Sequence, residues 1–191
     1  MDVLKLTPRP SPARTGVWLG IAAIAMSFAA YTSALVVRQG SAPDWRHFSL
    51  PPVLYLNTPL LLVSSGTLEL GRRRIVGRAP QMAFMASGVR WLSLTLALGL
   101  LFVGGQALAW RNLAAQGLFL ATNPSSAFFY VLTALHALHL LGGIAALGYV
   151  LGRVRVATPR PPAAALDAAA LYWHFMGVLW LYLLMVLVVR L

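Results

Sequence analysis

The chain contains no cysteine and very few acidic residues. Only four of its 191 residues are Asp or Glu, and charged residues of all types make up 10%. The absence of cysteine excludes disulfides and thiolate metal sites. An ordinary soluble domain has about a quarter charged residues, so the low charge excludes that class. With 59% hydrophobic residues, the sequence predicts an integral membrane protein.

The few charges are strongly unbalanced, with a formal net charge of +11. In a soluble protein this excess would indicate a nucleic-acid partner. Here the basic residues lie in short polar segments between long apolar stretches. They are therefore placed to face anionic lipid headgroups, and we expect no nucleic-acid partner.

Five apolar stretches are long enough to cross a bilayer, which requires about 20 residues as a helix. We therefore predict an all-α integral membrane bundle that forms a single transmembrane domain over residues 1–191. Asn123, followed by Pro124, is typical of a helix cap and start. Pro159, Pro161 and Pro162 interrupt the chain before the last span. The predicted spans are 16–37, 53–71, 88–110, 126–152 and 167–189.

The distribution of Lys and Arg predicts the orientation of the bundle. With the N-terminus in the cytoplasm, eleven of the fifteen basic residues lie in cytoplasmic segments and four lie outside. Positive charge favours the cytoplasmic side of a membrane protein. We therefore expect a cytoplasmic N-terminus and a periplasmic C-terminus.

Three histidines lie inside predicted spans, where ionisable groups are costly and are functional candidates by default. His136 and His139 are three residues apart in the fourth span, and His174 is in the fifth. They predict a polar seam between these two helices, in which imidazoles form hydrogen bonds across the contact. The alternative is that they bind a haem or a metal.

The expected depths of the histidines disfavour a haem held by two of them. His139 lies about 13 residues from the inner end of its span, or roughly 20 Å at the helical rise. His174 lies about 7 residues from the inner end, or roughly 10 Å. A zinc or copper site needs three or four converging ligands, and no acidic or sulfur ligand is available at these depths. We therefore expect no cofactor and no metal bound by this chain.

Glu69 is the remaining ionisable residue within a span. It precedes Arg72 and Arg73 by three and four residues, so the three share one helical face. This spacing predicts an ion pair at the membrane interface, with a proton-carrying carboxylate as the alternative.

The residues of four spans, in order, resemble subunit III of the haem–copper oxidases (cytochrome c and quinol oxidases) in its bacterial five-helix form. The resemblance covers nearly the whole chain. The motifs that carry it are Leu56-Asn57-Thr58 with Ser64-Ser65, Gly105-Gln106-Ala107 with Trp110, Phe128-Phe129 through His136-Ala137-Leu138-His139 to Gly142-Gly143, and Tyr172-Trp173-His174-Phe175 with Trp180.

The resemblance implies an accessory, non-catalytic subunit of a respiratory oxidoreductase complex in the inner membrane of a bacterium. Haem and copper would be held by the partner subunit I, and other oxidase subunits would also be partners. In this family, subunit III stabilises the catalytic subunit and holds structural phospholipids in a cleft between its first two helices and the others. The lipid-binding candidates here are Arg38, Arg72, Arg73, Arg90, Trp18, Trp91, Tyr172 and Trp173.

The chain departs from the family where the family usually has carboxylates. Ile24, Ala109 and Gly177 stand at or beside those positions. The loss of these acids indicates a divergent branch. Two alternatives remain open: a subunit-III-like protein of a nitric oxide reductase, and a small haem-binding membrane cytochrome.

Overall fold

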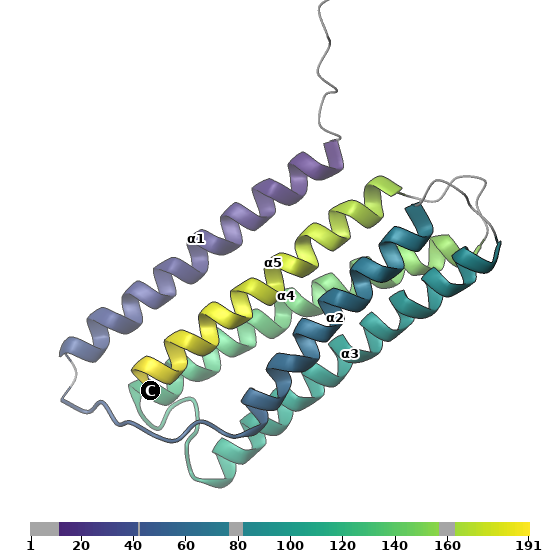
Figure 1. The fold of residues 1–191 in the computed structure, drawn as a ribbon. Helices are drawn as coiled ribbons and strands as arrows, with labels where there is room; N and C mark the ends of the chain where they lie inside the picture. Colours follow the sequence, from purple (N-terminus) through teal and green to yellow (C-terminus); the bar gives the residue numbers. More distant parts are fainter. Residues whose placement is uncertain (1–11, 42, 77–81, 157–162) are drawn as a thin grey trace, which may run out of the picture.

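Five long helices follow one another in the computed structural model, which describes residues 12–41, 43–76, 82–156 and 163–191 (Figure 1). All five are long and apolar enough to cross a membrane. The described part of the chain contains no strand, so the predicted all-α fold is confirmed. The helices are α1 (Pro12–Ser41), α2 (Val53–Val76), α3 (Met82–Ala115), α4 (Pro124–Arg155) and α5 (Ala163–Arg190).

Each helix extends beyond the span that the apolar stretch predicted, and α3 begins six residues before the expected position 88. The difference arises because backbone hydrogen bonding continues into the polar interface, whereas the count of apolar residues stops there. The predicted start of α4 is confirmed. Asn123 is its N-cap and accepts a hydrogen bond from the Ser126 amide at 2.8 Å. The expected break at Pro159–Pro162 lies outside the described residues.

The helices do not pack in chain order. The most extensive contact joins α2 and α3, which form an antiparallel hairpin (Figure 1). Among the described helices, the backbone of α5 packs against α1, α2 and α4, whereas that of α1 packs against α4 and α5 alone. The expected cleft between the first two helices and the others is therefore wrong, because α1 and α2 do not form a unit of their own.

Helix α1 is attached to the bundle by one narrow stripe. Its buried apolar side chains are Ile21, Phe28 and Leu35, which follow one another at seven-residue intervals. This spacing keeps the three on one helical face, as along the seam of a coiled coil. The remaining surface of α1 is largely exposed.

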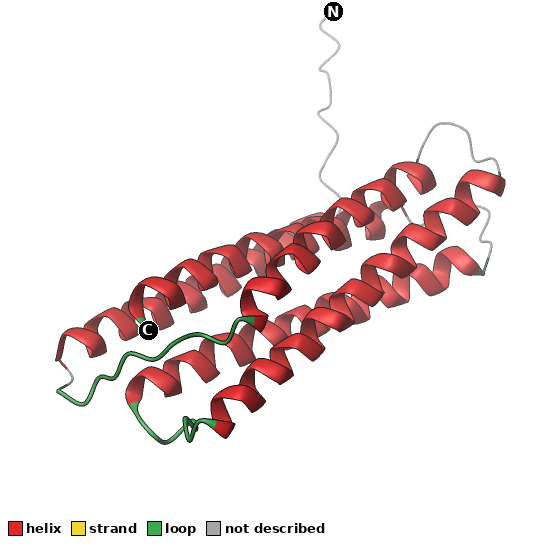
Figure 2. Ribbon diagram, turned by 60° about the horizontal axis from the view of Figure 1, so that its bottom comes forward, coloured by secondary structure: helices red, strands yellow, loops and turns green. Residues whose placement is uncertain are grey.

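Residues 45–52, which precede α2, run across one end of the bundle (Figure 2). The amide of Phe48 donates to the carbonyl of Leu191 at 3.0 Å, and the Ser125 hydroxyl donates to the carbonyl of Arg46 at 2.6 Å. The opposite end, where α2 and α4 end and α3 and α5 begin, is called the Arg-rich end below. Its described arginines are Arg14, Arg72, Arg73, Arg74, Arg90, Arg153 and Arg155.

Candidate functional site

Indole and hydroxyl groups connect the helices within the core. The Trp173 indole N–H donates to Ser64 at 3.0 Å, and that of Trp180 donates to Thr58 at 3.1 Å. Both bonds join α5 to α2. In a bilayer, apolar side chains gain little by leaving the lipid, so such hydrogen bonds and close packing contribute a large part of helix association.

Close approach between α2 and α3 depends on Gly105. The Asn57 amide donates to the carbonyl of Phe102 at 3.2 Å, and its side chain fills the space that a Cβ at Gly105 would need. About three turns further along the pair, the hydroxyls of Thr67 and Thr95 share a hydrogen bond of 2.8 Å. The motif around Asn57 and the Gly105 motif are therefore in direct contact between α2 and α3.

The structure does not bring the three predicted histidines together. His136 is fully buried against the rings of Phe102 and Trp180, with centroid distances of 5.8 and 5.2 Å. Neither of its ring nitrogens has a hydrogen-bond partner among the described residues. His136 therefore contacts α3 and α5 through aromatic packing.

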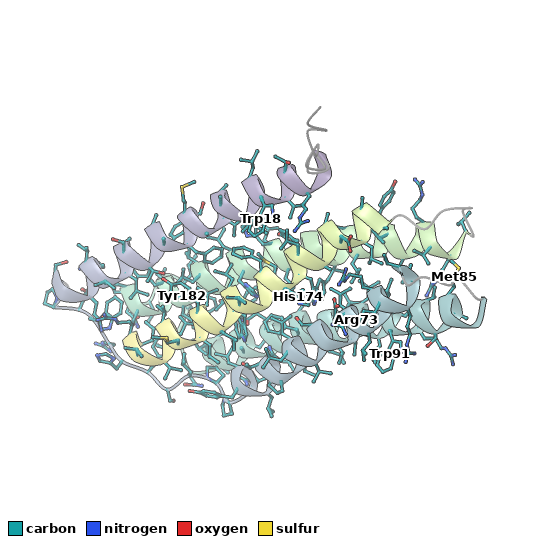
Figure 3. The ribbon with its side chains drawn as sticks, turned by 45° about the horizontal axis from the view of Figure 1, so that its top comes forward. Trp18, Arg73, Met85, Trp91, His174 and Tyr182 are labelled. Carbon is teal, nitrogen blue, oxygen red and sulfur yellow. The ribbon has the colours of Figure 1, made fainter. Side chains whose placement is uncertain are left out.

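The other two histidines face different neighbours. His139 bonds the carbonyl of Leu135 in its own helix at 2.7 Å, and its ring lies edge-on to Phe28 of α1 at 6.0 Å. His174 lies on α5, close to the turn of α2 that carries Arg73 (Figure 3). It lines a pocket of about 240 Å³ between α1, α2 and α5.

That pocket contains the predicted ion pair. Arg72 donates to both carboxylate oxygens of Glu69 at 2.8 Å, and Arg73 donates to Glu69 at 2.7 Å. Arg72 also donates to Asp167 at 2.7 Å, which joins the end of α2 to the beginning of α5. The predicted pairing of Glu69 is confirmed. Sequence reasoning missed Asp167, although the small number of acids beside many arginines could have indicated that it has an arginine partner.

The predicted lipid-binding residues lie in different environments. Trp18 is exposed on α1, and Arg38 pairs with Asp44 at 3.2 Å, away from the Arg-rich end. Tyr172 donates from its hydroxyl to the carbonyl of His139 at 2.9 Å. Trp173 is only 1% exposed, so its proposal as a lipid contact is wrong, because α2 and α3 cover the indole.

Arg90 and Trp91 lie together on the outer face of the α2–α3 hairpin. With Arg74, they line a groove between the two helices. Figure 3 shows Trp91 across the bundle from Trp18. A second groove, of about 480 Å³ and almost wholly apolar, lies between α1, α4 and α5 and is lined by Val17, Gly142, Tyr149 and Tyr172 among others.

The positions where the family usually has acids differ in how far they are buried. Ala109 and Gly177 are buried, and Ile24 is half-buried. A Cβ added at Gly177 would lie 3.5 Å from the Ser65 hydroxyl. Within the described residues, no three His, Cys, Asp or Glu side chains are grouped as a metal site requires. The described carboxylates instead lie toward the two ends of the bundle, in Asp44, Glu69 and Asp167.

Comparison with known proteins shows the family of the chain. The family described as cytochrome c oxidase subunit III matches residues 20–189. The probable cytochrome c oxidase subunit 3 of Mycobacterium tuberculosis is 31% identical, with 94% of this chain and 88% of the relative covered. The cytochrome c oxidase subunit 3 of Synechocystis sp. is 30% identical, with 88% of this chain and 71% of the relative covered. The chain therefore belongs to the cytochrome c oxidase subunit III family.

Proposed function

We propose that this chain is an accessory, non-redox subunit of a respiratory haem–copper oxidase in a bacterial inner membrane. It packs beside the catalytic subunit I, stabilises it and holds phospholipids at the contact. The family match over residues 20–189 supports the assignment to an oxidase complex. Haem and copper belong to the partner in this proposal.

The observation that best supports the non-redox role is that the three histidine side chains have different neighbours. His136 packs against Phe102 and Trp180, His139 packs against Phe28, and His174 faces the charged pocket. A haem held by two histidines needs both on opposite sides of one iron. The three imidazoles instead separate into three environments, which favours helix packing over ligation.

Purification in a mild detergent tests this role. We expect the chain to co-purify with a large, histidine-rich membrane subunit, and haem absorption to follow that partner after the subunits are separated. Because His136 has no hydrogen-bond partner among the described residues, His136→Phe should retain both the complex and its haem spectrum. A Soret band in the separated chain, or a haem band lost in His136→Phe, would contradict the proposal.

The orientation is also part of the proposal: the Arg-rich end faces the cytoplasm. The absence of cysteine makes single-cysteine labelling clean. Gln116 lies in the turn after α3 and Val156 at the end of α4, and both are exposed. A membrane-impermeant thiol reagent should label Gln116→Cys in intact spheroplasts, and Val156→Cys only after permeabilisation. The reverse pattern would invert the topology.

The nitric oxide reductase alternative shares the same family and differs in the partner. Identification of the co-purifying catalytic subunit decides between the two, because a nitric oxide reductase subunit in place of an oxidase subunit I would change the assignment of the complex.

A further inference from the structure

The few carboxylates in the described part of the chain leave most of its described arginines without an acidic partner. Of the four Asp and Glu residues, Asp2 lies outside the described residues. The other three are all paired: Asp44 with Arg38, Glu69 with Arg72 and Arg73, and Asp167 with Arg72. No described carboxylate therefore neutralises the arginines on the outer face of the α2–α3 hairpin.

Two of these arginines lie in one groove. Arg74 of α2 and Arg90 of α3 line a space of about 360 Å³ together with Ser87, Trp91 and Leu94. The Arg74 guanidinium donates to the Ser87 hydroxyl and lies over the Trp91 ring, 5.4 Å from its centroid. Arg90 is exposed and forms no hydrogen bond or ion pair with a described residue.

The groove is built by close packing between the two helices. Gly88 of α3 lies so near α2 that an added Cβ would be 2.6 Å from Ile75. Gly71 of α2 lies close to the backbone of Gly88, because a Cβ added at Gly71 would be 3.2 Å from the carbonyl oxygen of Gly88. The narrow crossing brings Arg74 across to the side of α3, where Ser87 and Trp91 hold it.

The groups in this groove match the parts of one kind of ligand. Two guanidiniums can each donate two hydrogen bonds to a phosphate, and like charges in one groove are relieved by an anion. Indole rings favour the headgroup level of a bilayer. Leu94, exposed further along α3, extends the groove with an apolar surface that suits an acyl chain.

We propose that the groove lined by Arg74, Ser87, Arg90 and Trp91 binds the phosphodiester of an anionic phospholipid. The inference rests on the lipid-binding part of the proposed function and assigns it a place. The proposal also divides the predicted lipid-binding arginines into those that are paired with a carboxylate and the one that is not. Arg38, Arg72 and Arg73 are engaged by carboxylates, whereas Arg90 is available to a ligand.

The test uses the intact oxidase complex, purified in mild detergent and titrated with phosphatidylglycerol or phosphatidylcholine while bound lipids are counted by native mass spectrometry. Arg90→Gln is the primary variant, because Arg90 is exposed and forms no hydrogen bond or ion pair with a described residue. Arg74→Gln/Arg90→Gln is the stronger variant. Arg153→Gln is the matched control: Arg153 also lies at the Arg-rich end, and its guanidinium is 6.0 Å from the ring centroid of Tyr149, outside the groove.

We expect the double variant to lose one phosphatidylglycerol and to bind it about tenfold more weakly, since each arginine near a headgroup contributes appreciably to anionic lipid binding. Arg90→Gln should show part of this loss, Arg153→Gln little or none, and phosphatidylcholine should not replace the lost lipid.

An equal loss in Arg153→Gln, or unchanged binding in both groove variants, would overturn the groove as the site while leaving the proposed function intact. Displacement of the lipid by millimolar inorganic phosphate would show that the site takes a free anion instead. A wild-type complex that retains no phospholipid would refute the lipid-binding part of the proposed function itself.

Discussion

Helix α1 and the α2–α3 hairpin differ in how they are held, although both consist largely of apolar residues. The hairpin combines close glycine contacts with buried hydrogen bonds, such as that between Thr67 and Thr95. Among the described residues, the hydrogen bonds from α1 to another helix are those between Gln39, near the end of α1, and Arg190 of α5. The difference indicates that polar and close-packed contacts fix the hairpin, while α1 is held mainly by its single apolar stripe.

The largest effect is expected where the hairpin packs most closely. Gly105→Ala places a methyl group in the space occupied by Asn57 and should destabilise the fold by about 1–3 kcal/mol, as overpacking does in other cores. Thermal unfolding in detergent measures the change. Gly104→Ala is the matched control, because nothing lies within 4 Å of a Cβ added there. Equal stability of the two variants would mean that the hairpin is not closely packed at Gly105.

A smaller effect is expected for the ion pairs that distinguish the two regions. Arg72 joins α2 to α5 through Glu69 and Asp167, so Arg72→Gln should cost about 1–2 kcal/mol and leave a carboxylate partly unpaired. Arg38→Gln removes an exposed pair beside α1 and should cost less than about 0.5 kcal/mol. The thermal unfolding midpoints of the two variants, measured at low and at high salt, test this difference. A larger loss in Arg38→Gln would reverse the comparison.

The smallest effect on global stability is expected in α1. Phe28→Ala removes a side chain that is 1% exposed and packs on His139, but lipid can fill the space beside a peripheral helix. We expect faster hydrogen exchange in the middle of α1 with unchanged exchange in α2 and α3. Met26→Ala, which alters an exposed side chain, should change neither. Equal acceleration in α2 and α3 would show that α1 is an integral part of the core.

The sequence predicted the number of helices, the cap at Asn123 and the ion pair of Glu69, because these depend on local spacing. It did not predict the neighbours of each helix. His136 and His139 share a face by spacing, yet one packs against Trp180 and the other against Phe28. Trp173 lies in a stretch that is apolar on all sides, so no periodicity distinguished its buried position from a lipid-facing one. The rotation of each helix is determined by packing between distant segments.

The partners of α1 have a consequence for how the protein is made. Both α4 and α5 follow α1 in the chain by more than 80 residues, and among the described helices these two are the ones against whose backbones α1 packs. During synthesis, α1 therefore enters the bilayer before either of its neighbours exists, while α2 and α3 can associate as soon as both are inserted. Helix α1 therefore gains its packing neighbours only after α4 and α5 have been inserted.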